Sequence, residues 1–320
     1  MPTNPLNGVD HSKRRRALQD VSNRSSLSRF SRSYVPKKLV QIRADNGLTQ
    51  RRVDKVDKND PLCKDDYIHE MFEHFVAREA TTSVRPLYME EQKQLNELMR
   101  AILVDWMVDV HFSYRLSLAT LYLAVNLIDR YLEKSPEISR KEFQLVGTTA
   151  LWIASKYEEI RPLEINQLVE VCDGCYTKHQ VFAKEGDILN TLHYSLCVPT
   201  SLTFLLRFLK VAKANRKMAH MSMFILEGTL GCYNLLHYLP SQMAAASIYI
   251  TRVTLLTGQP SWTKLLEEYT GFSKTDVLPV AKAIWMESKA NVNMTKLQAV
   301  RKKYSMVEYS SVAQIPLKGI

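Results

Sequence analysis

The fold is decided by Met99-Arg-Ala-Ile-Leu-Val-Asp-Trp106, which lies in a run from Leu95 to Phe112 without glycine or proline. Apolar residues recur in this run at intervals of three, four and seven, which predicts one long helix. The helix is apolar on most of its circumference, so we expect other helices on several sides of it. Arg100 and Asp105 then need partners, because an unpaired buried charge costs several kcal/mol.

Further helices follow this one along the chain. Apolar spacing predicts them over about 118–132, 141–159, 165–171, 177–192, 201–214, 217–236, 241–256, 262–269 and 274–291, with no competing strand pattern. Asn96 and Thr177 are expected N-caps, and Asp129 in the second helix is the expected partner of Arg100. Small residues at 147–155 and 242–247 occupy the same place in each half of the series. The sequence therefore predicts an all-α protein built from two five-helix units in tandem.

Two segments flank these units. Tyr67 to Phe75 has the spacing of an amphipathic lead-in helix that ends before Pro86, and we expect it to pack on the first unit. After Arg301, Tyr304 and Ile315 are apolar anchors without helical order, so we expect an extended tail over the surface. The predicted domains are a tail at 1–60, the lead-in helix and linker at 61–97, helical units at 98–197 and 198–300, and a C-terminal tail at 301–320.

The charge of the chain is concentrated in its first 60 residues. These hold fourteen Lys and Arg against six Asp and no Glu, a net charge of +8, so the remaining 260 residues carry only +2 of the total +10. Rich in Ser, Arg, Lys and Asn, this segment is expected to be disordered. The folded part has no strongly basic surface to indicate nucleic acid, and neither a membrane span nor a signal-peptide pattern is found. We therefore expect an intracellular soluble protein.

The cysteines favour a reducing compartment, because five is an odd number for a disulfide framework. Cys172 and Cys175 have the spacing of a metal knuckle or a redox motif. No second CxxC and no histidine pair accompanies them, so we interpret them as incidental thiols and expect no metal and no cofactor.

Five motifs give the chain a family resemblance. They are Met99 to Trp106, Leu123-Ala-Val-Asn-Leu-Ile-Asp-Arg130, Gln144-Leu-Val-Gly147, Ala154-Ser-Lys-Tyr-Glu-Glu-Ile160 and Tyr176-Thr-Lys-His-Gln180. Together they closely resemble the cyclin box of mitotic A/B-type cyclins. Ala299-Val-Arg-Lys-Lys-Tyr304 is similar to the B-type C-terminus, whereas Thr257 to Trp262 is more like the A-type, so a B-type cyclin is the first interpretation and an A-type cyclin the alternative. The resemblance implies two cyclin folds of five helices each.

The resemblance also implies a function that helix spacing does not show. Cyclins have no active site of their own; they bind cyclin-dependent kinases and activate them. Matched position by position, Lys156 and Glu185 would hydrogen-bond the kinase backbone, and Ile153, Tyr157, Leu189 and Leu196 would pack against its mobile helix. The alternative for Lys156 and Glu185 is an ion pair within the protein, and the two roles are compatible. Lys184 and Gly186 depart from the family pattern on either side of Glu185, and glycine weakens a helix by about 1 kcal/mol.

A second implied site is a shallow patch that captures Arg-x-Leu motifs of substrates and inhibitors. The residues that match it are Met99, Ile102, Leu103, Trp106 and Gln144, and Asp109 is placed to attract the arginine of the motif. Without the resemblance, all the apolar members would be assigned to the core. Arg100 and Asp129 are assigned a structural role only.

The N-terminal tail contains Arg15-x-x-Leu18-x-x-x-x-Asn23. This pattern resembles a destruction box, by which the anaphase-promoting ubiquitin ligase removes mitotic cyclins through ubiquitin-dependent proteolysis. Lys13 to Arg16 also fits a nuclear-import cluster, and a solvated basic patch is the plainer alternative. We expect the protein in both nucleus and cytoplasm, acting at the G2/M transition of the cell division cycle.

Other functions were weighed on the same sequence. A general transcription factor with two cyclin-like repeats would bring a zinc ribbon and a basic folded surface, and neither is present. A helical enzyme would show a phosphate-binding glycine loop, a zincin motif or a nucleophile elbow, and none is found. A cyclin with a non-mitotic task is an alternative closer to the first interpretation. The destruction box and the A/B-type motifs argue against it.

Overall fold

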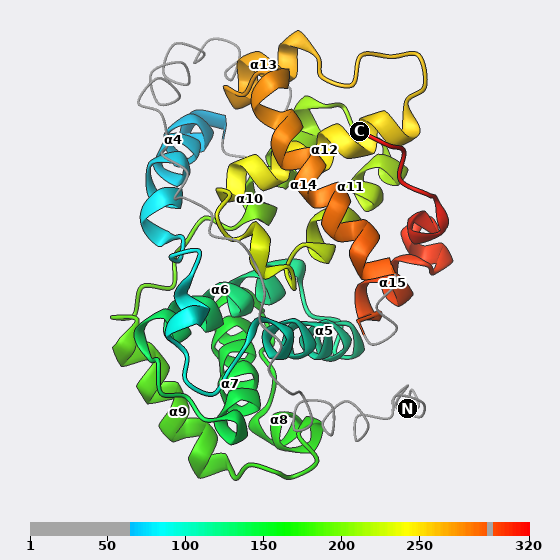
Figure 1. The fold of residues 1–320 in the computed structure, drawn as a ribbon. Helices are drawn as coiled ribbons and strands as arrows, with labels where there is room; N and C mark the ends of the chain where they lie inside the picture. The colour runs from blue at the N-terminus through cyan, green and yellow to red at the C-terminus, as the bar shows by residue number, and fades with distance from the viewer. Residues whose placement is uncertain (1–64, 293–296) are drawn as a thin grey trace.

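The computed structural model describes residues 65–292 and 297–320, and within these ranges the chain is helical without a strand (Figure 1). Its α-helices are α4 (Asp65–Thr82), α5 (Glu97–Ser113), α6 (Leu118–Lys134), α7 (Arg140–Glu158), α8 (Ile165–Val171), α9 (Lys178–Thr191), α10 (Ser201–Val211), α11 (Arg216–Gly228), α12 (Pro240–Leu255), α13 (Lys264–Thr270), α14 (Lys274–Val292) and α15 (Ala299–Tyr304). None of the helices described here has the length and apolar character needed to cross a bilayer.

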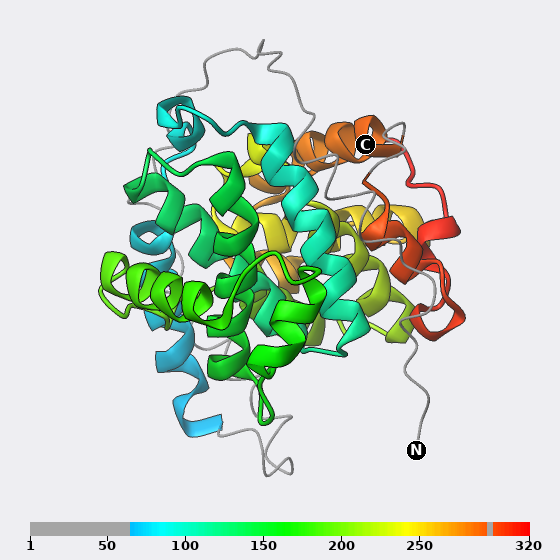
Figure 2. The same cartoon turned by 90° about the horizontal axis from the view of Figure 1, so that it is seen from below.

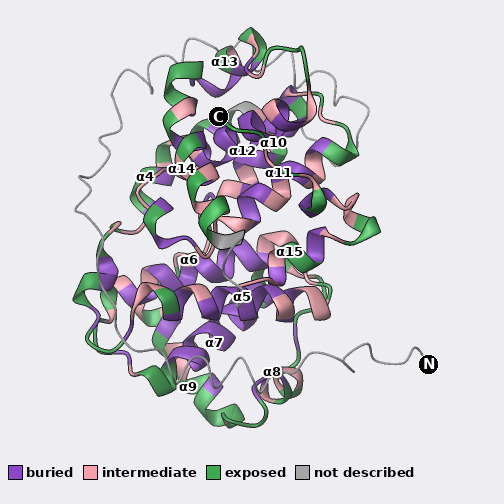
Figure 3. Cartoon of the chain, turned by 45° about the vertical axis from the view of Figure 1, so that its right-hand side comes forward, coloured by how far each residue is buried: buried purple, intermediate pink, exposed green. Residues whose placement is uncertain are grey.

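The helices form two bundles, α5–α9 in the lower half of Figure 1 and α10–α14 in the upper half. Each bundle encloses its own apolar core around a central helix, α7 in the first and α12 in the second. Within the first bundle, α7 packs against α5, α6 and α9, and Figure 2 shows this bundle from below. Both central helices are largely buried (Figure 3). The prediction of two five-helix units is confirmed.

Small residues let the central helix of the first bundle approach its neighbour. A Cβ placed on Gly147 of α7 would lie 2.7 Å from Cδ1 of Leu103 on α5, and Leu103 is completely buried. Any larger residue at this position would therefore push the two helices apart or force Leu103 from its site.

The lead-in helix α4 packs on the second bundle, so the expectation that it covers the first unit is wrong. Phe72 of α4 contacts Phe204 and Phe208 of α10 and Tyr269 of α13 with ring centroids 5.7, 6.1 and 5.8 Å apart. The buried carboxylate of Glu79 accepts hydrogen bonds from the backbone N–H and the hydroxyl of Ser241 at 2.9 Å, at the start of α12. Helix periodicity identified the apolar face of α4 but could not show which bundle it meets.

The C-terminal region is also more ordered than expected. Residues Ala299–Tyr304 form α15, and Tyr304 is completely buried. Asp105 of α5 accepts a hydrogen bond from the backbone N–H of Ala299 at 2.8 Å, while the Lys303 ammonium lies 2.7 Å from the Glu227 carboxylate of α11. We call these contacts of α15 the C-terminal clasp. The clasp joins the two bundles and supplies the partner that Asp105 requires.

The helix expected over 217–236 ends at Gly228 instead. Gly228 and Gly231 punctuate this segment, and a separate short 3₁₀ helix follows at Tyr233–Leu235. Glycine is a poor helix former, so the pair of glycines was the stop signal in the sequence.

Candidate functional site

The outer face of α7 and α9 carries the two residues expected to contact a kinase backbone. The Lys156 ammonium of α7 forms an ion pair with the Glu185 carboxylate of α9, with 38% of the lysine side chain and 16% of the glutamate side chain exposed. The ammonium also lies 3.7 Å from the centre of the Trp152 ring, a cation–π contact. The pair is thus held together within the protein and is still accessible from outside.

Local sequence positions both helices. Ser139 and Glu142 form a capping box at the start of α7, and Thr177 and Gln180 form another at the start of α9. Such a box satisfies two backbone groups that the first turn of a helix leaves unpaired. Thr177 is the N-cap that the sequence predicts, as Asn96 is for α5.

The apolar residues expected to pack on the kinase are buried to different degrees. Tyr157 is exposed, Leu189 and Leu196 are half-buried, and Ile153 is almost wholly buried in the first core. Burial and a hydrogen bond with the thiol of Cys197 raise the pKa of Tyr157, so its hydroxyl stays protonated at neutral pH. Ile153 therefore offers little surface to a partner, whereas the other three keep part of their surface accessible.

Three further exposed apolar residues belong to these helices or the turns after them, and sequence reasoning missed them. Ile160 is fully exposed after α7, Phe182 is half-exposed on α9, and Tyr194 is exposed after α9. Phe182 packs edge-on against Trp152 at 5.4 Å between ring centroids. A signal was available, because Phe182 shares the helical spacing of Glu185 and Leu189. We call Tyr157, Ile160, Phe182, Leu189, Tyr194 and Leu196, with the Lys156–Glu185 pair, the α7/α9 face.

Lys184, which departs from the family pattern, has partners of its own. Its ammonium lies 2.9 Å from the Asp187 carboxylate and 3.2 Å from the Tyr131 hydroxyl of α6. Burial alone would lower the pKa of Lys184, but these hydrogen bonds raise it, so the lysine stays charged. It therefore anchors α9 on α6 beside the α7/α9 face.

The residues expected to form a peptide-docking patch lie together but are covered. Met99, Ile102, Leu103, Trp106 and Gln144 are all buried, and Asp109 is half-buried. Met99, Leu103 and Trp106 belong to the first apolar core, which is the role that helical spacing alone assigns to them. Peptide binding at this position stays a prediction.

Arg100 and Asp129 form the expected ion pair. Nε and Nη2 of Arg100 donate to the two Asp129 oxygens at 2.6 and 2.7 Å, and both side chains are almost completely buried. The third nitrogen of Arg100 donates to the carbonyl of Leu230 at 2.9 Å, and the Tyr88 hydroxyl donates to Asp129 at 2.7 Å. Burial alone would lower the pKa of Arg100, but the Asp129 charge outweighs it and raises the pKa. The pair holds the first bundle against the segment that follows α11.

The two cysteines of the CxxC sequence lie in different surroundings. Cys172 is buried with its sulfur 3.1 Å from the Thr148 hydroxyl, whereas Cys175 is exposed. Across residues 65–292 and 297–320, no group of three or more His, Cys, Asp or Glu side chains is arranged to hold a metal ion. Arg15, Leu18 and Asn23 lie outside the described residues.

Comparisons with known proteins match this architecture. Residues 70–197 match the cyclin N-terminal domain and residues 199–318 match the cyclin C-terminal domain. The chain is 38% identical over 268 residues to Cyclin-B2-4 of Arabidopsis thaliana, covering 83% of this chain and 62% of that protein. It is 37% identical over 262 residues to G2/mitotic-specific cyclin-1 of Medicago sativa subsp. varia, covering 82% of this chain and 60% of that protein.

The chain therefore spans about three fifths of the length of these relatives. Among solved structures, the viral cyclin from herpesvirus saimiri superposes with a TM-score of 0.61 at 21% identity, covering 70% of this chain and 96% of that one. That likeness supports the cyclin fold. Because it matches both cyclin domains and is similar to B-type and G2/mitotic cyclins over most of its length, the chain belongs to the cyclin family.

Proposed function

We propose that this chain is a regulatory subunit that binds a cyclin-dependent kinase through the α7/α9 face and activates it at the G2/M transition. One observation carries the proposal: two adjacent helices present an accessible Lys156–Glu185 pair, and exposed apolar side chains lie on the same helices or in the turns that follow them. Exposed apolar groups that gather around a charged pair are typical of an interface that buries its centre on binding.

The Lys156–Glu185 pair suits recognition of a backbone. In the free protein each charge satisfies the other. At an interface the lysine can donate to a partner's carbonyls and the glutamate can accept from its N–H groups, so neither charge is buried alone. The apolar residues around the pair would pack on the partner helix.

Activation follows from kinase chemistry. Phosphoryl transfer requires the kinase's own Lys–Glu pair and its magnesium-binding Asp to be in place, and the helix that carries that Glu controls this arrangement. A cyclin that binds only the productive arrangement shifts the kinase population toward it. The chain would act by differential binding, without catalytic residues of its own.

The test is phosphorylation of a histone-type substrate by an inactive cyclin-dependent kinase mixed with the full chain. We expect strong activation by the wild type and its loss in Lys156→Ala/Glu185→Ala. Lys264→Ala/Glu268→Ala is a matched control, because it removes an exposed Lys–Glu pair on α13 of the other bundle. Equal activation by both double mutants would show that the kinase binds a different surface of the chain. No activation by the folded wild type would overturn the proposed function.

Substrate docking is a separate part of the proposal. We infer that Arg-x-Leu peptides bind over α5 and α7, with Trp106 and Leu103 holding the leucine, Gln144 the peptide backbone and Asp109 the arginine. Because the first three side chains are buried in the free protein, binding requires them to become accessible. Fluorescence polarisation with a labelled Arg-x-Leu peptide and the full chain tests this, and absence of binding would leave these residues with a packing role alone.

The proposed degradation of the protein depends on motifs in its N-terminal tail. We infer that Arg15, Leu18 and Asn23 direct ubiquitin transfer by the anaphase-promoting ligase, and that Lys13 to Arg16 brings part of the protein into the nucleus. Arg15→Ala/Leu18→Ala should abolish ubiquitination in a mitotic extract while leaving kinase activation intact. Unchanged ubiquitination of this variant would remove the assignment, and a fluorescent fusion of the same chain reports its distribution between nucleus and cytoplasm.

A further inference from the structure

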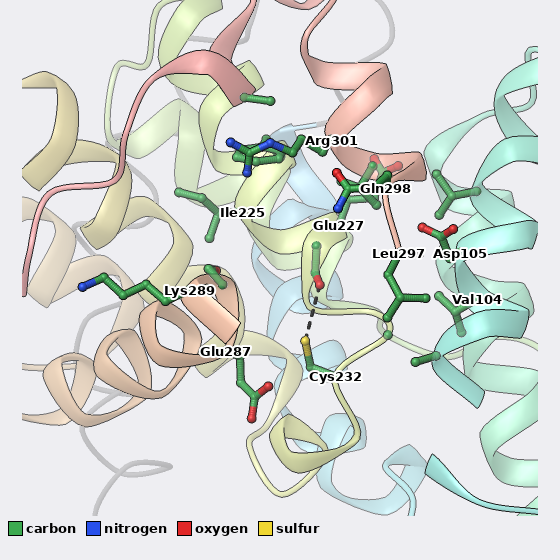
Figure 4. A pocket seen from close by; sticks show the side chains of 18 of the residues that line it. Val104, Asp105, Ile225, Glu227, Cys232, Glu287, Lys289, Leu297, Gln298 and Arg301 are labelled. Carbon is green, nitrogen blue, oxygen red and sulfur yellow. Dashed lines mark hydrogen bonds between the residues drawn. The ribbon is translucent and has the colours of Figure 1, made fainter. Parts of the chain in front are cut away.

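A cavity of about 550 Å³ lies between the two bundles, on the side of α5 that faces α11 and α14. Figure 4 shows Val104 and Asp105 on one side of it and Glu287 and Lys289 on the other, with Leu297 and Gln298 between them. This volume is within the range of sites that bind small ligands or a few residues of a peptide. Neither the α7/α9 face nor the expected docking patch contributes a residue to it.

The cavity has apolar walls, which include Leu98, Val108, Phe224, Val300 and Leu317. Apolar side chains of an occupant would pack against these walls.

The lining carries four acids, Glu97, Asp105, Glu227 and Glu287, against two bases, Lys289 and Arg301. Two of the acids are already engaged in the C-terminal clasp, Asp105 by the Ala299 N–H and Glu227 by Lys303.

Glu97 and Glu287 form no ion pair among the described residues; Glu287 accepts one hydrogen bond, from the amide of Asn234 at 3.0 Å. Burial, and then the neighbouring charges of Glu287 and Glu90, raise the pKa of Glu97. A pair of carboxylates in this situation favours an occupant with positive charge.

We propose that the cavity is occupied by Tyr34-Val-Pro-Lys-Lys-Leu-Val-Gln-Ile-Arg43 of this chain's own N-terminal tail. The segment combines apolar side chains for the walls with two adjacent lysines for Glu97 and Glu287. Charge complementarity between a tail of net charge +8 and these two carboxylates is the main argument.

The connection is long enough. The 21 residues between Arg43 and Asp65 can extend about 70 Å, compared with a radius of gyration of about 20 Å for a folded chain of this size. Because the segment is tethered, its effective concentration at the cavity is high and even modest contacts suffice. This inference is independent of kinase binding.

Photo-cross-linking of the full chain tests the proposal. With p-benzoylphenylalanine in place of Tyr34, we expect the cross-linked peptides found by mass spectrometry to contain residues 97–108 or 285–289. Lys37→Glu/Lys38→Glu should lower that yield about fivefold, the size expected for losing two partly exposed ion pairs. Arg51→Glu/Arg52→Glu makes the same charge change elsewhere in the tail and should leave the yield unchanged.

Variants on the cavity side complete the test. Glu97→Gln/Glu287→Gln should lower the yield as the lysine variant does, whereas Glu308→Gln, on an exposed turn outside the cavity, should not. Cross-links that fall elsewhere, or that respond equally to both tail variants, would overturn the proposal. Cross-links that join isotopically heavy and light chains in a mixture would overturn it too, because the occupant would then be a second copy.

Discussion

The interior between the two bundles and the outer α7/α9 face both carry pairs of opposite charge, but in different surroundings. Arg100–Asp129 and Lys303–Glu227 have almost no exposed side-chain surface, whereas Lys156–Glu185 lies at the surface. A buried pair cannot lose one partner without leaving a desolvated charge, while an exposed pair exchanges its partner for water or for another protein. The same chemistry therefore stabilises the fold in one region and leaves a surface available for binding in the other.

The largest expected effect comes from breaking an interior pair. Asp129→Ala leaves Arg100 charged and buried and also removes the acceptor of the Tyr88 hydroxyl, so the free energy of unfolding should fall by about 3–5 kcal/mol. Urea denaturation followed by circular dichroism measures it. A loss as small as that of an exposed pair would show that burial does not distinguish the two regions.

Two glycines, Gly147 inside the first bundle and Gly186 on α9, give the next contrast. Gly147→Ala should destabilise by about 1–3 kcal/mol, because its Cβ would lie 2.7 Å from a buried Leu103 carbon. Gly186 on α9 has no atom within 4 Å of the same position, so Gly186→Ala should stabilise by up to about 1 kcal/mol. Thermal denaturation of both variants gives the sign of each change, and equal signs would contradict the structure.

A buried histidine makes the interior sensitive to pH. Burial, and then the charge of Lys303, lower the pKa of His111 to about 3, so the folded protein holds it neutral. The unfolded chain binds this proton near pH 6.5, so stability from this group is complete above pH 6.5. It falls by up to about 1.4 kcal/mol per unit as the pH drops toward 3. Urea titrations give the free energy of unfolding at pH 7 and at pH 5. The difference between these two values should be smaller for His111→Gln than for the wild type, and an equal difference in both proteins would exclude this histidine as the cause.

The smallest effect on stability belongs to the outer pair. Lys156→Ala/Glu185→Ala should change the free energy of unfolding by less than about 1 kcal/mol, as for other accessible ion pairs. The same variant is expected to lose kinase activation, so the comparison between regions is sharpest here. A loss of several kcal/mol would mean that the α7/α9 face depends on this pair to fold.

Much of the fold followed from local signals in the sequence. Apolar spacing predicted the positions of the α-helices from α4 to α14, and Asn96 and Thr177 were identified as caps from residue type. The Arg100–Asp129 pair followed from the need to neutralise a buried charge. Each of these inferences depends on neighbours along a helix or on one strong electrostatic requirement.

Contacts between distant segments could not be predicted in the same way. Phe72 packs on the second bundle through Phe204, which lies more than a hundred residues further along the chain. The helix that ends at Tyr304 is held by Glu227 of α11, which is also distant in sequence. At the α7/α9 face, the sequence predicted the ion pair as an alternative, and the helical spacing of Phe182 places it near Glu185. The exposure of Tyr194, which lies after the end of α9, emerged only from the folded arrangement.

The C-terminal clasp has a consequence for how the protein is made. A ribosome adds about 5–20 residues per second, so Ala299 follows Asp105 by roughly 10–40 s and Lys303 follows Glu227 by roughly 4–15 s. Until then Asp105 and Glu227 lack the Ala299 and Lys303 groups that they contact in the finished protein. The second bundle is complete only when α14 has been made, so α15, which follows it directly, is the last α-helix to be added and the one that completes the joint between the bundles.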